Sequence, residues 1–322
     1  MKRVMIIDAL NAFIRAYIVD PSLSSNGPPI GGVKGFIKIL QKMSREMKPD
    51  QIVICWDGEY GSNKRRSQNK NYKSGRTPIR LNRSVHNMSD EQVVANKIWQ
   101  QTQLFDLLNQ MPVIQFMFPQ VEADDVISVV AQSPVYEGWQ KVIVSSDKDF
   151  IQLLGSDDVV LYRPIQKQAL NKLRVIEEYG IHPTNFAMAR AMAGDASDSL
   201  KGIRGIGMPT VAKRLNFLKE EKSFTFNDIY EHCENVEKKL KIHTNILENK
   251  AVIENNYKLM QLYSPSISIQ SKQQIRHTLE NADMGFNKTG VTKIMHRIGF
   301  GELNWLDLAA ILRRISLENS GE

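Results

Sequence analysis

Short apolar runs alternate with helical periodicity through the first half of the chain. The apolar runs predict strands over 3–7, 51–56, 113–116, 141–145 and 158–162. Apolar positions spaced three and four apart predict helices between them, over 11–18, 31–47, 90–110 and 123–131. Ser89, followed by Gln92, predicts a capping box that opens the helix at residue 90. This order of elements indicates an α/β fold over about residues 1–170, with a mostly parallel sheet flanked by helices.

The strand pattern fades from about residue 172. Helical patterns follow over 172–179, 184–193, 208–219, 226–240, 245–262, 288–298 and 304–316. No segment is long enough to be a linker to an independent domain. We therefore expect residues 171–322 to be mainly helical and to pack against the sheet.

Carboxylates gather where the predicted strands end. They are Asp8, Asp57, Glu122, Asp124, Asp125, Asp147, Asp149, Asp195 and Asp198. The carboxyl ends of parallel strands meet at one edge of a sheet, so we expect these residues to converge. Two like charges about 4 Å apart repel by roughly 4 kcal/mol at an effective dielectric of about 20. Hard divalent cations held by oxygen ligands would relieve that repulsion, which predicts metal-assisted phosphodiester chemistry. The alternative for Glu122 and Asp125 is ordinary acidic decoration of a first helical turn.

A basic stretch over 60–89 contains no acidic residue. Its cations are Lys64, Arg65, Arg66, Lys70, Lys73, Arg76, Arg80 and Arg83, and Tyr72 lies among them. Lysine and arginine side chains can follow a phosphate backbone, and a tyrosine can stack on a base. Because the stretch begins just after Asp57, we expect it to lie over the acidic pocket. The alternative is a solvated loop.

A glycine-rich segment follows the last aspartates. Gly202, Gly205 and Gly207 precede a helix that starts near Pro209, a residue suited to the first helical position. Glycines let the backbone approach a phosphate closely. Positive charge is added by Lys201, Arg204, Lys213 and Arg214. The segment over about 195–219 predicts a helical hairpin that grips phosphates, with a tight structural turn as the alternative.

The overall charge agrees with a polyanionic partner. The net charge is +7 and the pI is about 9.2. With the nine carboxylates set aside, 42 basic residues face 26 acidic ones, which suits a nucleic acid that is held and then cut. The two cysteines form no CxxC pair, so we expect a reducing cytoplasm. No apolar run reaches about eighteen residues, and Asp8 interrupts the N-terminal one, so we expect neither a membrane span nor a signal peptide.

In combination, these segments resemble the 5′ nuclease family: the flap endonucleases and 5′–3′ exonucleases of phages, and the 5′-nuclease domain of bacterial DNA polymerase I. IIDALNAFIRAY is similar to the family's first strand, with Asp8 and Arg15 in register. KRRSQNKNYKSGR is similar to a basic segment that gives Arg65, Tyr72, Lys73 and Arg76. VEADD, SSDKDF and GDASDSLKGIRGIG match the remaining motifs in order, so the resemblance covers about residues 3–215. The length without a polymerase domain resembles a stand-alone phage-type enzyme.

The resemblance implies a PIN-like catalytic domain, an arch over about 60–95 and a helix–turn–helix variant that binds duplex DNA. It also implies two Mg²⁺ or Mn²⁺ ions, and a K⁺ ion in the 202–207 loop. The first dication would be held by Asp8, Asp57, Glu122, Asp124 and Asp125, and the second by Asp147, Asp149, Asp195 and Asp198. Lys73 and Arg65 would act on the scissile phosphate. Ser199, Lys201 and Pro209 depart from the family's usual Asn, Pro and Lys, so the duplex grip and the K⁺ loop are where this chain should differ.

The implied function is a structure-specific 5′ nuclease that removes RNA primers or 5′ flaps during DNA replication. Its substrates would be DNA with 5′ ends or flaps and RNA–DNA hybrids, the latter through RNase H activity. We expect a monomer in the cytoplasm of a bacterial or phage-infected cell, with a single-strand-binding protein or a polymerase as partner. Two alternatives remain at this point: a PIN-type single-strand ribonuclease, and a non-catalytic protein that binds branched DNA.

Overall fold

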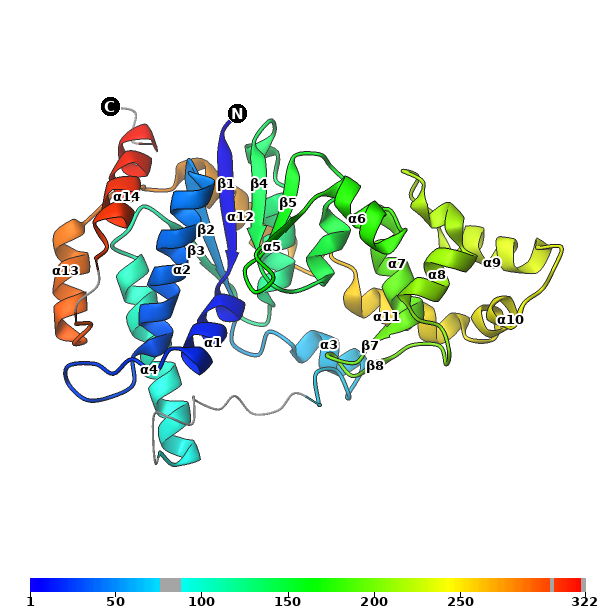
Figure 1. Ribbon diagram of the computed structural model, residues 1–322, viewed down its shortest axis with the longest axis horizontal. Coiled ribbons are helices and arrows are strands. Elements are labelled where there is room, and N and C mark those ends of the chain that lie inside the picture. The colour runs from blue at the N-terminus through cyan, green and yellow to red at the C-terminus, as the bar shows by residue number, and fades with distance from the viewer. Residues whose placement is uncertain (76–87, 302–303, 320–322) are drawn as a thin grey trace.

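A six-stranded sheet forms the centre of the protein (Figure 1). The computed structural model describes residues 1–75, 88–301 and 304–319. The strands are β1 (Arg3–Asp8), β2 (Gln51–Trp56), β3 (Ile114–Met117), β4 (Gln140–Val144), β5 (Val159–Arg163) and β6 (Gln168–Leu170). They lie in the order β3-β2-β1-β4-β5-β6, and every pair is parallel except β5–β6. The mostly parallel sheet predicted from the apolar runs is confirmed.

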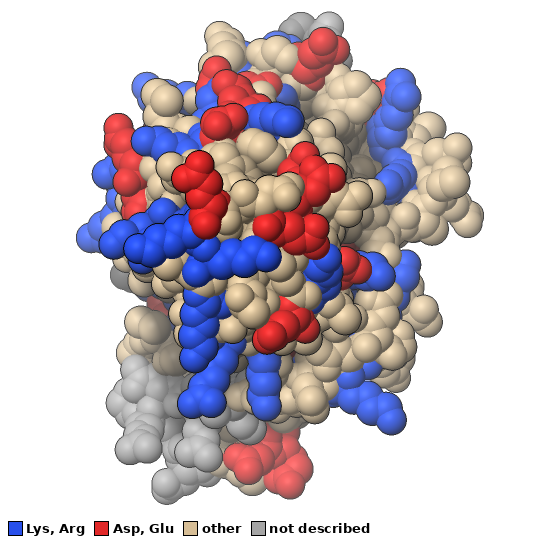
Figure 2. Space-filling view, turned by 90° about the vertical axis from the view of Figure 1, so that its right-hand side faces the viewer, with Lys and Arg blue, Asp and Glu red and all other residues tan. Residues whose placement is uncertain are grey.

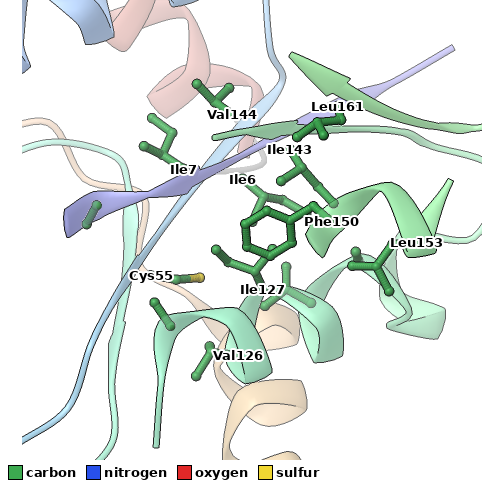
Figure 3. Packing of buried hydrophobic residues seen from close by; sticks show 14 of the residues in the cluster. Ile6, Ile7, Cys55, Val126, Ile127, Ile143, Val144, Phe150, Leu153 and Leu161 are labelled. Atoms are coloured by element: carbon green, nitrogen blue, oxygen red, sulfur yellow. The ribbon is translucent and has the colours of Figure 1, made fainter. Parts of the chain in front are cut away.

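Helices cover both faces of this sheet, which is why the central strands β1, β2 and β4 are buried along nearly their whole length. On one face lie α1 (Ala9–Val19), α2 (Gly31–Met47) and α4 (Asp90–Leu108); on the other lie α5 (Ala123–Ala131) and α12 (Ile269–Asn281). Figure 3 shows the packing on the α5 side, where Ile6 of β1, Ile127 of α5 and Phe150 face one another. All three side chains are fully buried. Their packing holds β1 and β4 in place in the sheet. It therefore also positions the residues that follow those two strands.

The second half of the chain is helical, as expected. Its helices are α6 (Lys172–Tyr179), α7 (Pro183–Ala193), α8 (Met208–Arg214), α9 (Phe226–Asn235), α10 (Lys241–Glu248), α11 (Lys250–Met260), α13 (Lys288–Arg297) and α14 (Leu306–Asn319). Helices α6 to α11 extend to one side of the sheet, whereas α13 packs on α4 and α14 on α2 at the opposite end. One continuous apolar core includes residues from both halves, from Val4 to Ile315. The boundary near residue 170 stays a prediction.

The structure differs from the sequence expectations in a few elements. The helix expected over 245–262 is two helices, α10 and α11, which meet at Asn249, and the one expected over 208–219 ends at Arg214 before a 3-10 turn. The short elements β6, α3 (Asn63–Gln68), β7 (Gly194–Asp195) and β8 (Leu200–Lys201) and the polar helix α12 were not predicted. Each of the four short elements spans less than two helical turns, too short to show a period. Pro209 is the second helical residue, because α8 starts at Met208, and the Ser89 capping box is present.

Within the described residues, no helix is long and apolar enough to cross a membrane.

Candidate active site

The carboxyl edge of the parallel sheet carries the predicted acidic residues. β1 ends at Asp8, and Asp57 comes directly after β2. Asp147 follows β4, just before a 3-10 helix that begins at Asp149. In Figure 1 this edge faces downward, toward α3 and the β7–β8 hairpin. We call the nine predicted carboxylates together the acid cup.

Charge interactions connect the two halves of the acid cup. The interacting carboxylate pairs are Asp8–Asp57, Asp8–Asp147, Asp8–Asp124, Asp124–Asp147, Asp124–Glu122, Asp149–Asp147, Asp149–Asp195 and Asp149–Asp198. Asp147 takes part in both halves, and Asp125 is joined to Glu122 through their shared partner Arg65. Tertiary structure therefore brings these groups together at one edge of the sheet, as the strand pattern predicts.

Hydrogen bonds fix the Asp8 carboxylate at the end of β1. Its Oδ1 accepts from the Asn11 backbone N–H at 3.1 Å, which caps α1, and its Oδ2 accepts from the Ser145 hydroxyl at 2.9 Å. The Ser145 oxygen also accepts from the Asp147 N–H at 3.1 Å, so one buried serine positions Asp8 and Asp147 relative to each other. Burial and the neighbouring Asp57 carboxylate raise the pKa of Asp8 to about 7, although both hydrogen bonds favour the ionised form. Burial likewise raises the pKa of Asp124, against the pull of Lys73.

Three carboxylates form the second half of the cup. Oxygens of Asp149, Asp195 and Asp198 all lie within 4.8 Å of one another, a spacing at which they could share a metal ion. Burial and the Asp147 charge raise the pKa of Asp149 to about 7. Arg190 opposes this repulsion, because its Nη2 donates to Asp149 at 2.9 Å and also pairs with Asp195. Burial disfavours the charge on Asp195, but hydrogen bonds from Ser197 and the Arg190 charge lower its pKa.

The donors of the acid cup fit divalent metal ions. Every predicted ligand offers a carboxylate oxygen, the donor that hard dications such as Mg²⁺ and Mn²⁺ prefer. The raised pKa values of Asp8, Asp124 and Asp149 have one cause in common, which is burial beside other carboxylates. A dication at such a position stabilises the ionised forms that burial penalises.

Two cations from the basic stretch that follows Asp57 contact the first half of the cup. Arg65 of α3 binds Asp125 with two nitrogens, at 2.8 and 3.0 Å, and also contacts Glu122. The Lys73 Nζ lies 2.6 Å from Glu122 Oε1. Burial disfavours the charge on Glu122, but Lys73 and Arg65 outweigh it and lower the pKa of that carboxyl. In this conformation Glu122 and Asp125 are neutralised by protein cations, so their assignment as metal ligands stays a prediction.

Tyr72 is buried rather than presented to solvent. It is 3% exposed, its hydroxyl donates to Glu122 Oε2 at 3.3 Å, and its ring belongs to a small apolar cluster with Leu200, Leu259 and Met260. Burial and the nearby Glu122 charge raise its pKa, so the phenol is neutral. Base stacking by this ring, as expected from the sequence, would require it to be uncovered first, and it stays a prediction.

The glycine-rich segment turns tightly beside the second half of the cup. A Cβ at Gly202 would lie 2.1 Å from the Ala193 carbonyl oxygen, so only glycine fits there, and Gly205 has a φ of +79°. The Asn256 side chain ties the turn to α7, donating to the carbonyls of Ala191 and Lys201 at 3.0 Å each. Exposed positive side chains follow at Arg204, Lys213 and Arg214, and Gly207 precedes α8. Figure 2, which views this end of the molecule, shows Lys and Arg side chains next to one another on its surface.

The remaining residues predicted to contact DNA lie outside the acid cup or outside the described residues. Lys64, Arg66 and Lys70 are exposed on or just after α3, and Arg15 is partly buried on α1. Arg76 and Arg80 lie outside the described residues. The nucleic-acid contacts of all these residues stay predictions.

Three side chains that shape the cup were not predicted from the sequence: Ser145, Arg190 and Asn256. Ser145 is the first residue of the SSDKDF motif, and Arg190 precedes Asp195 by five residues. Within MARAMA, however, Arg190 gives only a helical pattern, with no sign that its guanidinium points at the aspartates. Asn256 lies in a segment without any motif, so no sequence signal could have found it.

Along most of its length the chain is similar in sequence to known proteins. A family model described as the 5′–3′ exonuclease N-terminal resolvase-like domain matches residues 3–180. The chain is 27% identical over 306 residues to a 5′–3′ exonuclease of Buchnera aphidicola, covering 94% of this chain and 98% of that protein. It is 28% identical over 269 residues to a 5′–3′ exonuclease of Aquifex aeolicus, covering 82% and 83%. It is 26% identical over 321 residues to DNA polymerase I of Bacillus subtilis, covering 94% of this chain but 32% of the polymerase.

Solved structures share the fold. The T5 5′-exonuclease with bound zinc ions superposes with a TM-score of 0.64 at 16% identity, covering 92% of this chain and 100% of that one. A bacteriophage T5 flap endonuclease in a complex with DNA and metal ions gives a TM-score of 0.62 at 16% identity, covering 93% and 100%. At this level of identity the likeness establishes the fold alone.

Proposed function

The chain belongs to the 5′–3′ exonuclease family, and from this premise we propose that it is a structure-specific 5′ nuclease that cuts DNA bearing 5′ ends or flaps. The observation that carries the proposal is the acid cup: carboxylates from separate motifs interact at one edge of the sheet, with basic residues above and beside them. A site of this kind can hold dications against a phosphodiester and position the backbone around it.

We propose that two divalent ions, Mg²⁺ or Mn²⁺, bind in the cup. The triad Asp149, Asp195 and Asp198, with Asp147 beside it, is the proposed second site. The first site is built around Asp8 and Asp124, with Asp57, Glu122 and Asp125 as further ligands. When bound, the two ions would activate a water molecule and neutralise charge on the attacking and leaving oxygens.

The arch cations are proposed to serve the scissile phosphate. Lys73 and Arg65 now neutralise Glu122, and a phosphate entering the cup would offer them a second anionic partner. Each can then stabilise charge that develops during cleavage, because both sit in a partly buried region of reduced dielectric. Ser145 and Asn11 keep the Asp8 carboxylate oriented during these exchanges.

The finer points of the function are proposals of the same kind. The exposed basic residues on α8 suit duplex DNA, with a K⁺ ion in the 202–207 loop. RNA–DNA hybrids, RNA primers and 5′ flaps are the proposed substrates in replication, with RNase H activity on hybrids. A single-strand-binding protein or a polymerase is the proposed partner of a monomer that works in the cytoplasm.

A cleavage assay tests the proposed function directly. The purified protein, Asp147→Asn and Asp157→Asn are each given a 5′-labelled flap duplex with and without Mg²⁺. The Asp147→Asn protein should bind the flap at least as well as the original while cutting far more slowly, since one repulsive charge is removed from the cup. Asp157 is an exposed aspartate outside the cup, so its variant should cut normally.

The outcomes separate the alternatives. Cleavage without any dication would contradict the proposal. Flap binding with no cutting by the unmodified protein would indicate a non-catalytic branched-DNA-binding protein. Preference for single-stranded RNA over the flap would indicate a PIN-type ribonuclease instead.

A further inference from the structure

Arg190 lies inside the second half of the acid cup. It is in the last turn of α7, and its guanidinium Nη2 donates to Asp149 Oδ1 at 2.9 Å and pairs with Asp195 Oδ2. These are two of the three carboxylates whose oxygens lie within 4.8 Å of one another. The Arg190 side chain is only 15% exposed, so solvent screens the pairs weakly.

We propose that Arg190 is a built-in counter-ion of the second metal site, which holds the triad together before a dication binds and competes with that dication for the same oxygens. Arg190 would therefore weaken the binding of the second dication, whose arrival would displace the Arg190 contacts. This inference rests on the proposed function, because it concerns a site that the nuclease reaction would use.

The competition follows from the geometry and the charges. A dication bonds directly to carboxylate oxygens, and Arg190 Nη2 already bonds one oxygen of Asp149 and one of Asp195. An arginine cannot lose its proton in a protein, so it can relieve repulsion from a second cation only by moving. A cation that shares the triad thus lowers the affinity of the site for any further positive charge.

The guanidinium is held in a way that permits such movement. Nη2 makes both bonds to the carboxylates, whereas the buried Nε has no hydrogen-bond partner within the described residues. Turning Nη2 away from the triad therefore sacrifices no bond made by Nε. Arg65 is held differently, because three of its nitrogens have partners: Nε donates to the Leu259 carbonyl, and Nη1 and Nη2 bind Asp125. Of these two arginines, Arg190 is therefore the one that can be displaced with the smaller loss of hydrogen bonds.

Calorimetric titration of the full chain with Mn²⁺ at pH 8, without DNA, tests the proposal. The proteins compared are the original, Arg190→Gln, Arg190→Lys and the control Arg174→Gln, which removes an exposed arginine of α6 outside the cup. Loss of the Arg190 charge should leave one of the two Mn²⁺ sites unchanged and tighten the other by roughly tenfold. Arg190→Lys keeps the charge and should leave that site within about threefold of the original, and Arg174→Gln should not change it.

Equal or weaker Mn²⁺ binding by a folded Arg190→Gln protein would overturn the inference, because it would make Arg190 a purely structural support of the triad. If the original protein binds two Mn²⁺ ions in that case, the proposed nuclease keeps its metal requirement and only the role of Arg190 fails. If the original binds no Mn²⁺ at all, the proposed function fails with it.

A second measurement covers the possibility that Arg190→Gln does not fold. In the original protein, the Arg190 Nε–H signal in a ¹⁵N-resolved NMR spectrum, assigned by its loss in Arg190→Lys, is followed during a Mg²⁺ titration. It should shift in step with one of the two binding phases. A signal that stays constant through saturation of both sites would refute displacement of Arg190.

Discussion

Replacing Asp8 with asparagine should stabilise the metal-free protein at pH 8. Asp8 is 7% exposed and lies beside Asp57 and Asp147, so its negative charge destabilises the folded state. Asparagine removes the charge but keeps the oxygen that accepts from the Asn11 N–H, and it is as good a helix cap as aspartate. The Ser145 hydroxyl can turn to accept from the new amide.

The magnitude follows from the pKa of Asp8. Its ordinary value of 3.8 rises to about 7 in the folded protein, and at about 1.4 kcal/mol per pKa unit the charge costs about 4 kcal/mol above neutral pH. Below about pH 4 the carboxyl is protonated in both the folded and unfolded states, so the penalty is absent. It grows as the pH rises from about 4 to 7, because the unfolded chain has lost the proton that the folded state still favours. Above about pH 7 it is constant.

The assay is thermal denaturation followed by circular dichroism in EDTA from pH 4 to 8. At pH 8 the Asp8→Asn protein should melt roughly 5 °C above the original, and the gap should close toward pH 4. Asp20→Asn is the control and should lower the melting temperature at pH 8. Burial disfavours the charge on Asp20, but hydrogen bonds from Ser22 and Lys38 outweigh burial and lower its pKa. With saturating Mg²⁺ the Asp8→Asn advantage should vanish, since only the original gains a full metal site. Equal melting of the two proteins in EDTA at pH 8 would refute electrostatic strain in the cup.

Further predictions concern Arg65, the glycine turn and the proposed DNA contacts. Arg65→Met should lower the free energy of unfolding by about 3–5 kcal/mol in chemical denaturation, because buried Asp125 loses its counter-ion and Glu122 keeps only Lys73. An unchanged midpoint would contradict this. Gly202→Ala should abolish flap cleavage and lower the melting temperature sharply, since its Cβ would collide with the Ala193 carbonyl. Gly205→Ala should add only about 1 kcal/mol of backbone strain. Similar effects of the two substitutions would contradict the close approach of Gly202 to the Ala193 carbonyl. If arch and hairpin together neutralise about five phosphates, log affinity for a flap duplex should fall with log salt at a slope of roughly −4 to −5, and a flat dependence would exclude backbone contacts.

Much of the architecture was predictable because its signals are local. The five parallel strands were found within one or two residues, since each is rich in apolar residues that are buried in the core. The capping box at Ser89 was found because both of its partners lie within one turn. The β7–β8 hairpin was missed, because two-residue strands carry no period, and its shape depends on contacts from Gly202 and Asn256.

The acidic groups were predictable as a set, but their individual states were not. Their positions after strands imply convergence at one sheet edge, but they do not say which side chains pair with cations. Which of them are neutralised by protein cations depends on side chains that fold in from elsewhere: Arg65 reaches Asp125 across sixty positions, and Arg190 turns back onto Asp195. Tyr72, expected from the sequence to be available for stacking, is instead buried under helix α11.

The order of residues alone determined the layered α/β architecture, the family and the collection of carboxylates, because apolar periodicity and strand-end position are properties of short segments. Tertiary structure decided which carboxylates keep raised pKa values and which are paired with a cation. Charge interactions act through space and depend on burial, so groups far apart in the chain acquire their energies only once the fold has set the distances between them.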